Sequence, residues 1–279
     1  MLHPVEKADV LIEALHWIRE FRDKVFVIKL GGSLMTNPLP RVHGGGPAIN
    51  RAMLEAGLQS RFVLGRRYTC EKTLAIVERV LANEVNEQIV EQITILGGKA
   101  KSLNFNSKCI AFGEPIKLKD DDGNLLDVGY VGTVTRVDRK TIEELLHSGT
   151  IPVIPSMCLT EEGQKLNVNA DTVAMVIAQE FKAEKLVYLS DINGVRADKD
   201  DPESLIPTLT PEMAEELFRK GVIQSGMIPK VQACLATVEK GVRKVHIVDG
   251  RLRHSLLLEI FTTFGIGTEI VSSTHHPVK

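Results

Sequence analysis

A lysine stands near the end of an apolar segment and just before a glycine pair. Lys29 follows the β-branched run VFVI (25–28), and Gly31-Gly32-Ser33 begins two residues later. A run of this kind is typical of a buried parallel strand, and burying an unpaired ammonium group is costly. Glycines at a strand end let backbone N–H groups approach an anion closely. These residues favour an anionic partner for Lys29, and the alternative is a lysine whose charged end reaches the edge of the sheet.

Two further glycine turns and a second lysine repeat this combination. The turns are Gly44-Gly45-Gly46 and Asn193-Gly194, and Lys230 ends the stretch SGMIPK (225–230), where a helix is expected to begin. Each turn alone also suits an ordinary tight turn, and Lys230 alone also suits a solvated lysine. Together the lysines and glycine loops point to phosphoryl transfer, in which catalysis is mostly positioning and charge neutralisation.

The stretch NVNAD (167–171) opens a predicted helix with polar residues. Asp171 suits a helix N-terminus for electrostatic reasons alone, worth about 0.3–1 kcal/mol, and Asn167 and Asn169 suit a plain turn. The same residue types at the carboxyl edge of a sheet also suit a polar ligand. Both interpretations are open on these residues alone.

Several functional classes are disfavoured by the sequence. It contains no GxxxxGK[ST] loop, no GxGxxG fingerprint and no HRD–DFG set. The net charge of −2 gives no case for nucleic acid. No long apolar window predicts a membrane span, and the N-terminus lacks a signal peptide. The four cysteines have neither disulfide nor zinc spacing. We expect a cytoplasmic protein that binds neither nucleic acid nor membranes.

The order of predicted elements indicates an α/β fold. Helices are expected over 5–22, after HGGGP (43–47), over about 70–97, from near Asp171, after Thr210-Pro211-Glu212, from Ile228 and over 254–262. Strands are expected at 25–30, 150–156, 185–191 and 244–249. Asp122-Gly123 predicts a hairpin within 115–135. Alternating strands and helices predict a three-layer αβα sandwich with an open, mainly parallel central sheet. We expect an N-terminal helix in 1–24, one lobe in 25–160 and another in 161–279.

The connection after the first strand is unusually short. Only the eleven residues from Gly31 to Arg41, with Pro38 and Pro40 among them, separate this strand from VHGGG. A crossover between parallel strands normally takes about a dozen residues or more and usually includes a helix. The sequence therefore predicts an incomplete or abnormal connection at this point.

Six motifs, in this order, resemble those of the N-acetylglutamate kinases within the amino-acid kinase family. They are KLGGS (29–33), VHGGGP (42–47), GRRYT (65–69), NVNADT (167–172), LSDINGV (189–195) and GMIPKV (226–231). The likeness extends from about residue 25 to residue 271. It implies the amino-acid kinase fold and the ATP-dependent phosphorylation of the side-chain carboxylate of N-acetyl-L-glutamate, a step of arginine biosynthesis. The product would be an acyl phosphate, and no covalent enzyme intermediate is implied.

The resemblance implies that five residues act on the phosphoryl group during its transfer. Lys29 and Lys230 would neutralise its charge, and Asp171 would hold both lysines. Backbone N–H groups of Gly32 and Gly45 would bind its oxygens. ATP would carry Mg²⁺ on its phosphates, with few dedicated protein ligands.

The resemblance also implies a substrate site and a nucleotide site. Arg67 would pair with the α-carboxylate of N-acetylglutamate, a contact that suits the guanidinium fork. Asn167, Gly45 and Gly46 would complete the substrate site. The nucleotide would be bound by Ser190, Asp191 and Gly194.

Regulation and assembly follow from the same resemblance. The helix at 5–22 has an apolar stripe that includes Trp17 and Phe21; the alternative is that it simply packs on its own domain. In the family such a helix accompanies hexamers that arginine inhibits. The implied arginine site has His254, Glu259 and Gly267 as contacts. We expect a homo-oligomer, either a hexamer built as a trimer of dimers or a dimer.

Two departures from the family pattern keep alternatives open. Cys70 follows GRRYT where the family usually has an acid, and roughly 25 residues are missing between KLGGS and VHGGGP. The shortened connection favours a non-catalytic ligand-binding or regulatory member of the fold, whereas Lys29, Asp171 and Lys230 argue for a kinase. A kinase for another amino acid is the remaining alternative.

Overall fold

The computed structural model describes residues 4–31, 45–198, 200–223, 227–263 and 265–273. Its contacts divide the chain into two compact units. Unit 1 comprises Met1–Ile28 and Phe181–Lys279, and unit 2 comprises Lys29–Glu180. The chain therefore passes from one unit to the other after Ile28 and again after Glu180. The predicted lobe boundary at residue 160 stays a prediction. The shortened connection and Gly32 lie outside the described residues.

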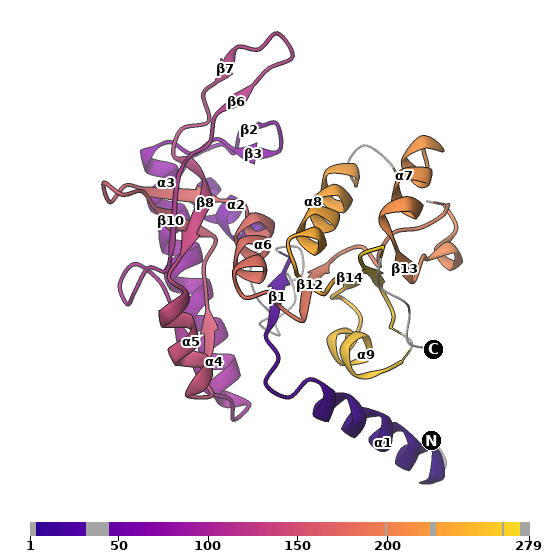
Figure 1. The fold of residues 1–279 in the computed structure, drawn as a ribbon. Coiled ribbons are helices and arrows are strands. Elements are labelled where there is room, and N and C mark those ends of the chain that lie inside the picture. Colours follow the sequence, from indigo (N-terminus) through magenta and orange to yellow (C-terminus); the bar gives the residue numbers. More distant parts are fainter. Residues whose placement is uncertain (1–3, 32–44, 199, 224–226, 264, 274–279) are drawn as a thin grey trace. The chain divides into compact units, whose positions relative to one another are not determined.

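Unit 1 contains a five-stranded sheet with the strand order β1-β12-β14-β15-β13 (Figure 1). Its strands are β1 (Phe26–Leu30), at whose Ile28 the unit ends, β12 (Lys185–Ser190), β13 (Thr208–Leu209), β14 (Lys244–Asp249) and β15 (Thr268–Ile270). Its helices are α1 (Pro4–Glu20), α7 (Pro211–Arg219), α8 (Ile228–Glu239) and α9 (Ser255–Phe261), and a 3-10 turn spans Pro202–Ser204. These bounds confirm the elements predicted for this part of the chain.

The centre of this sheet is apolar and mostly parallel. β12 and β14 run parallel from Lys185 opposite Lys244 to Ser190 opposite Asp249. Every residue of β12 is buried, as are all residues of β14 after Lys244. Apart from their ends and His246 in β14, both strands are apolar, as expected of strands covered on both faces. Their carboxyl ends place Ser190 and Asp249 side by side.

Unit 2 is built from several smaller sheets. Its helices are α2 (Gly46–Glu55), α3 (Glu71–Val77), α4 (Asn86–Ile95), α5 (Arg139–His147) and α6 (Ala170–Glu180). Its strands are β2 (Phe62–Val63), β3 (Arg66–Arg67), β4 (Ala100–Ser102), β5 (Ala111–Pro115), β6 (Leu118–Lys119), β7 (Leu125–Leu126), β8 (Val131–Val137), β9 (Ile151–Val153), β10 (Met157–Leu159) and β11 (Lys165–Val168). The predicted hairpin is β6–β7, and β10-β11-β8-β5 form a closed barrel that the sequence did not predict. The α/β class is confirmed.

The helix predicted over 70–97 is interrupted by a π-helix. The segment Glu78–Val85 is wound as a π-helix between α3 and α4. The Asn104 side chain donates to the carbonyl oxygen of Ala82 at 2.7 Å, and Asn86 donates to Ser102 Oγ at 2.6 Å and to the Val153 carbonyl at 3.0 Å. Side chains that bond carbonyl groups within a helix stabilise such a wide turn. The buried core of unit 2 packs around this segment.

The turn between β2 and β3 holds a leucine in a left-handed conformation. Leu64 and Gly65 have φ of 45° and 75° between the paired residues Val63 and Arg66. A two-residue turn with both φ values positive is type I′, which favours Asn-Gly. Leucine in this conformation costs about 1–2 kcal/mol.

We therefore expect Leu64→Asn to stabilise the protein. The gain should be about 0.5–1 kcal/mol, or roughly 1–4 °C in thermal unfolding. Leu64→Ala is the matched control, because it removes the same exposed side chain and keeps the unfavourable φ. An equal rise in the melting temperature of both variants would show that exposure, and not backbone conformation, limits stability here.

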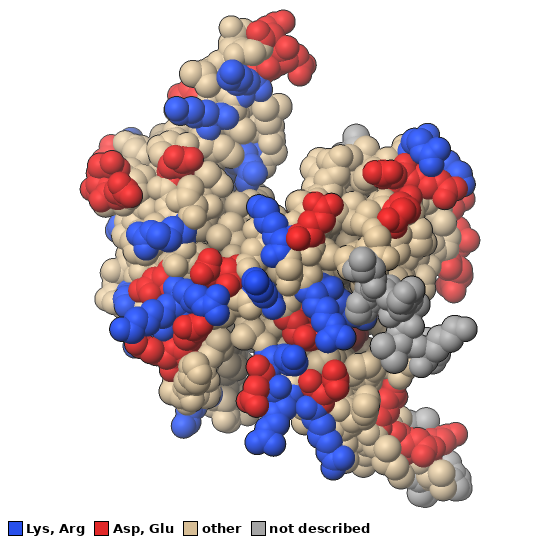
Figure 2. All heavy atoms as spheres, viewed as in Figure 1, with Lys and Arg blue, Asp and Glu red and all other residues tan. Residues whose placement is uncertain are grey.

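Charged side chains of both signs are spread over the face seen in Figure 2. This mixture matches the net charge of −2. Among the helices within the described ranges, none is both long enough and apolar enough to cross a bilayer.

Candidate functional site

Lys29 is paired with Asp171 within unit 2. Its ammonium group lies 2.6 Å from Asp171 Oδ1, and the two side chains are 14% and 36% exposed. Lys29 is carried by β1, and Asp171 lies in the first turn of α6. The Asn169 side chain accepts hydrogen bonds from the backbone N–H groups of Asp171 and Thr172, so it caps this helix. The cap leaves the Asp171 carboxylate available to hold Lys29.

Arg67 is a buried cation with neutral partners. It is 8% exposed, and burial lowers the pKa of its guanidinium. Within the described residues its hydrogen bonds go to Ser60 Oγ at 2.6 Å, to Met53 Sδ at 3.4 Å and to the Gly46 carbonyl at 3.5 Å. A buried charge without a counter-charge is costly. The site is therefore suited to an anionic ligand, and a carboxylate matches the guanidinium fork.

The N-terminus of α2 lies beside this arginine. Gly45 is the N-cap residue; no side chain among the described residues caps the helix, and its first turn contains no acid. A Cβ on Gly45 would meet Leu81 Cδ2 at 2.1 Å, so a larger residue would force the Leu81 side chain to move. A Cβ on Gly46 would meet none of the described residues within 4 Å. Uncapped N–H groups at a helix N-terminus attract anions, and the Arg67 guanidinium adds a full positive charge.

Asn167 is joined to the strand of Arg67 through a buried threonine. Its amide donates to Thr69 Oγ1 at 3.0 Å, and this hydroxyl donates to the Arg67 carbonyl at 2.9 Å. Thr69 is fully buried. Within unit 2, hydrogen bonds thus connect Asn167 through Thr69 to Arg67, and Arg67 to Gly46, which follows Gly45. Nothing in the sequence indicated the role of Thr69.

Lys230 and the predicted nucleotide residues belong to unit 1. Lys230 is in the first turn of α8, which contains no acid and is capped by no side chain from the part of the chain that the structure describes. Its ammonium group lies 5.5 Å from the centre of the buried Tyr188 ring. A lysine at an uncapped helix N-terminus fits phosphate oxygens.

Ser190, Asp191 and Gly194 follow the carboxyl end of β12. Ser190 Oγ donates to Asp191 Oδ1 at 3.3 Å. Gly194 has φ of 131°, and a Cβ there would meet Thr268 Oγ1 at 2.4 Å, so packing alone already requires this glycine. The sequence analysis missed the neighbouring pair Asp249 and Arg251, in which the guanidinium bonds both carboxylate oxygens and thereby lowers the pKa of Asp249.

Glu259 and Gly267, two of the three predicted arginine contacts, lie together in a buried polar cluster of unit 1. The Glu259 carboxylate accepts from His246 Nδ1 at 2.7 Å and from the backbone N–H groups of Ile266 and Gly267. Burial raises the pKa of Glu259, but these hydrogen bonds outweigh it and the pKa is lowered overall. His254 is exposed and accepts from Arg253 Nε at 2.9 Å. Its predicted role stays a prediction.

A buried lysine lies near this cluster and was also missed. Burial and the neighbouring Lys244 lower the pKa of Lys185 to about 8, although nearby Glu259 acts in the opposite direction. The Lys185 ammonium group lies 4.8 Å from the centre of the Phe21 ring, just beyond α1. The end of α1 therefore lies next to the buried charges of unit 1.

Cys70 replaces the expected acid as the N-cap of α3. Its sulfur lies 3.3 Å from Thr73 Oγ1, and hydrogen bonding to Thr73 lowers the pKa of the thiol. The Cys70 side chain makes no capping hydrogen bond to the backbone of α3, so this contact joins only the two side chains.

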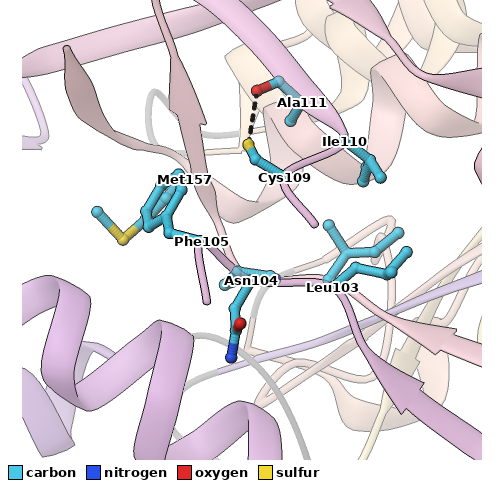
Figure 3. Close-up of a pocket in the computed structure, with 9 residues that line it drawn as sticks. Leu103, Asn104, Phe105, Cys109, Ile110, Ala111 and Met157 are labelled. Atoms are coloured by element: carbon cyan, nitrogen blue, oxygen red, sulfur yellow. Dashed lines mark hydrogen bonds between the residues drawn. The ribbon is translucent and has the colours of Figure 1, made fainter. Parts of the chain in front are cut away.

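Two cavities elsewhere contain none of the predicted site residues. Figure 3 shows the first, of about 10 Å³, where the Cys109 thiol donates to the Ala111 carbonyl at 3.3 Å. It has room for about one water molecule, and burial raises the Cys109 pKa. The second is a mainly apolar groove of about 570 Å³ on unit 1, lined in part by Leu205, Met213 and Val271. Neither has the charged groups that phosphoryl transfer needs.

Solved structures with a similar fold include amino-acid-pathway and carbamate enzymes. N-acetylglutamate synthase from Neisseria gonorrhoeae, complexed with coenzyme A and N-acetyl-glutamate, matches with a TM-score of 0.79 and 24% identity; the match covers 96% of this chain and 64% of that one. Giardia carbamate kinase matches with a TM-score of 0.59 and 12% identity, covering 90% and 99%. At these identities the likeness concerns the fold alone.

Curated relatives match nearly the full length of the chain. Acetylglutamate kinase from Moorella thermoacetica is 43% identical over 297 residues, covering 97% of this chain and 99% of the relative. The corresponding protein of Aquifex aeolicus is 43% identical, covering 95% and 98%. An alignment of 297 positions against 279 residues leaves at least 18 positions of the first relative without a counterpart here. This agrees with the predicted loss of a segment.

A model of the whole family identifies the chain independently of individual relatives. The model described as "Amino acid kinase family" matches residues 41–249, about three quarters of the sequence. This match and the near full-length relatives lead to one assignment. The chain belongs to the amino acid kinase family.

Proposed function

We propose that this chain transfers the γ-phosphoryl group of ATP to the side-chain carboxylate of N-acetyl-L-glutamate, in arginine biosynthesis. The observation that carries the proposal is the 43% identity to acetylglutamate kinases over 97% of the chain. A carboxylate oxygen attacks the γ-phosphorus, the bond to the β,γ-bridging oxygen breaks, and ADP leaves with the electron pair. The attacking carboxylate is already ionised, so no general base is needed.

The acceptor end of the site rests on the environment of Arg67. Its buried guanidinium, hydrogen-bonded only to neutral groups among the described residues, supports a role as the partner of the substrate α-carboxylate. The links of Asn167 through Thr69 and of Gly46 to Arg67 support their assignment to the same substrate. The first turn of α2, which no described side chain caps, supports the role proposed for the Gly45 N–H group.

The phosphoryl group requires positive charge that is already in place. Lys29, held by Asp171 at 2.6 Å, supplies one such charge, and Lys230 at the start of α8 supplies the other. Both roles follow the general logic of phosphoryl transfer, in which charge on the equatorial oxygens is neutralised. Ser190, Asp191 and Gly194 are assigned to the nucleotide. Mg²⁺ would travel on the ATP phosphates and neutralise part of their charge.

A coupled ADP-release assay tests this function. ADP release that depends on N-acetylglutamate, and not on glutamate, aspartate or carbamate, would support it. Release with a different acid would assign the chain to another substrate. Binding of N-acetylglutamate and ATP without any ADP release would identify a non-catalytic member of the fold.

We also propose that arginine inhibits the enzyme and that α1 mediates assembly into a hexamer. Glu13 on α1 accepts from the N–H and hydroxyl groups of Thr263 at 2.6 and 2.7 Å, and Figure 1 shows α1 beside α9. Six large apolar residues of α1 are more than half exposed; they are Val5, Val10, Leu11, Ile12, Leu15 and Ile18. Such a stripe supports an interface with a second copy. Glu259 lies on α9, the helix that contacts α1, and we assign it to the arginine site.

Deleting residues 1–22 should leave a dimer that no longer responds to arginine. In the full-length enzyme arginine should raise the apparent KM for N-acetylglutamate. Leu11→Glu with Leu15→Glu is a sharper variant, because both side chains are exposed and the Glu13–Thr263 contact is retained. Light scattering should show the loss of the hexamer in both cases. A full-length protein that is already a dimer, or that ignores millimolar arginine, would contradict this proposal.

A further inference from the structure

The hydroxyl group of Ser60 links the candidate substrate arginine to helix α2. Arg67 Nη1 donates to Ser60 Oγ at 2.6 Å, and Ser60 Oγ donates to Asn50 Oδ1 at 2.8 Å. A serine hydroxyl has one proton to donate and two lone pairs to accept with. Because Asn50 takes the proton, a lone pair of the oxygen faces the guanidinium. We propose that Ser60, oriented by Asn50, is a positioning residue that sets the angle at which Arg67 presents its charge to the substrate.

The partner that Ser60 offers to Arg67 is an uncharged hydroxyl group, and this affects how Arg67 binds an anion. A carboxylate in place of Ser60 would form an ion pair with Arg67 and compete with the α-carboxylate of the substrate. A hydroxyl oxygen fixes the guanidinium and leaves its charge uncompensated. The inference rests on the proposed function, since it takes N-acetylglutamate as the ligand of Arg67.

Other contacts fix the remaining freedom of the guanidinium. Its Cζ lies 4.8 Å from the centre of the Phe62 ring, so the aromatic ring faces the cation. Met53 Sδ lies 3.4 Å from the same Nη1 that bonds Ser60. Within the described residues Nε has no hydrogen-bond partner, and Nη2 has only the long contact of 3.5 Å to Gly46. The Nε and Nη2 groups therefore form the edge of the guanidinium that is presented to a carboxylate. Two neighbouring N–H groups of a guanidinium bind a carboxylate through two parallel hydrogen bonds.

Asn50, Ser60 and Arg67 come from three consecutive parts of unit 2. Asn50 is on α2, Ser60 precedes β2, and Arg67 ends β3. The two hydrogen bonds thus tie the hairpin that carries Arg67 to the helix whose first turn contains Gly46. Loss of these hydrogen bonds should weaken binding of the substrate and leave the phosphoryl-transfer groups, Lys29 and Asp171, in place.

The kinetic test compares Ser60→Ala with Ser60→Thr. Loss of one hydrogen bond to a charged group at a partly exposed site should raise the KM for N-acetylglutamate about 3- to 10-fold. We expect kcat and the KM for ATP to change by less than about twofold, because the lost contact is equally present in ground and transition states. Ser60→Thr keeps the hydroxyl and should restore the KM. Ser148→Ala, which removes a local hydroxyl-to-carbonyl bond in the same unit, is the control and should have no kinetic effect.

A double-mutant cycle shows whether Ser60 acts through Arg67. In an Arg67→Lys background the fork is already lost, so Ser60→Ala should add little further change to the KM. Full additivity of the two changes would overturn the proposal, as would an unchanged KM in Ser60→Ala itself. Both results would leave the proposed function intact.

A spectroscopic measurement decides the proposal independently of activity. In protein labelled with ¹⁵N at arginine, a guanidinium held by Ser60 should show separate Nη signals, assigned by their disappearance in Arg67→Lys. Ser60→Ala should merge them through faster rotation about the Nε–Cζ bond, and Ser60→Thr and Ser148→Ala should not. A wild-type enzyme inactive with N-acetylglutamate would refute the proposed function alone. Nη signals unchanged by Ser60→Ala would refute the positioning role.

Discussion

Lys29→Ala and Lys230→Ala should each lower kcat by two or more orders of magnitude. Each change removes a positive charge that acts mainly on the phosphoryl group in the transition state, and such losses reduce kcat. Folding should be little affected. The ion pair of Lys29 with the 36% exposed Asp171 contributes only modestly, so the melting temperature should change by no more than about 3 °C. Turnover and thermal unfolding are measured on the same preparations.

Each of these variants has a matched control. Lys240→Ala changes the lysine that caps the opposite end of α8, and Lys140→Ala changes an 87% exposed lysine of unit 2. Neither control should alter turnover. Wild-type kcat in both Lys29→Ala and Lys230→Ala would refute the charge-neutralisation mechanism. A large fall in melting temperature would instead point to a structural role.

Arg67→Lys should raise the KM for N-acetylglutamate about 10- to 100-fold. Lysine keeps the positive charge but loses the planar fork that bonds a carboxylate through two N–H groups. The KM for ATP should stay within about twofold, because the guanidinium is assigned to the acceptor substrate. Initial rates with each substrate varied in turn give both constants.

The neighbouring arginine provides the control for this prediction. Arg66 lies on the same two-residue strand, where alternate side chains point to opposite faces. Arg66→Lys should therefore leave both KM values unchanged. Equal increases for ATP and N-acetylglutamate in Arg67→Lys would contradict the assignment of Arg67 to the substrate α-carboxylate.

The sequence predicted elements well wherever periodicity and turn chemistry agreed. α1, α7 and α8, the strand at 244–249 and the Asp122-Gly123 hairpin were all expected close to their observed bounds. The π-helix Glu78–Val85 was not, because its apolar spacing resembles that of an ordinary helix. It depends on hydrogen bonds between residues distant in sequence, from Asn86 to Ser102 and Val153 and from Asn104 to Ala82. The barrel of β5, β8, β10 and β11 likewise depends on pairings that no local pattern specifies.

In the site, too, residues that stand out in the local sequence were predicted, and residues whose role depends on tertiary contacts were not. Lys29 and Asp171 stood out by residue type, and the structure pairs them. Ser60 and Thr69 are small polar residues with no signal of their own, and only the approach of Arg67 and Asn167 gives them a role. His246 lies inside the strand 244–249, and its residue type alone indicated no role. Its bond to Glu259 spans a strand and a helix and is a tertiary feature.

The order in which the units occur along the chain has a consequence for synthesis on the ribosome. Unit 2 is one continuous segment inserted between the two parts of unit 1. β1 can pair with β12 only after β12 has been synthesised, and β12 begins 157 positions after Ile28. At about 5–20 residues per second this takes roughly 8–30 s. During that interval the side chains of α1 and β1 lack their partners in the later part of unit 1; Phe21, just beyond α1, lacks Phe261, for example. This early part of unit 1 therefore completes its packing only after unit 2 has been synthesised, and it is a segment in need of chaperone protection.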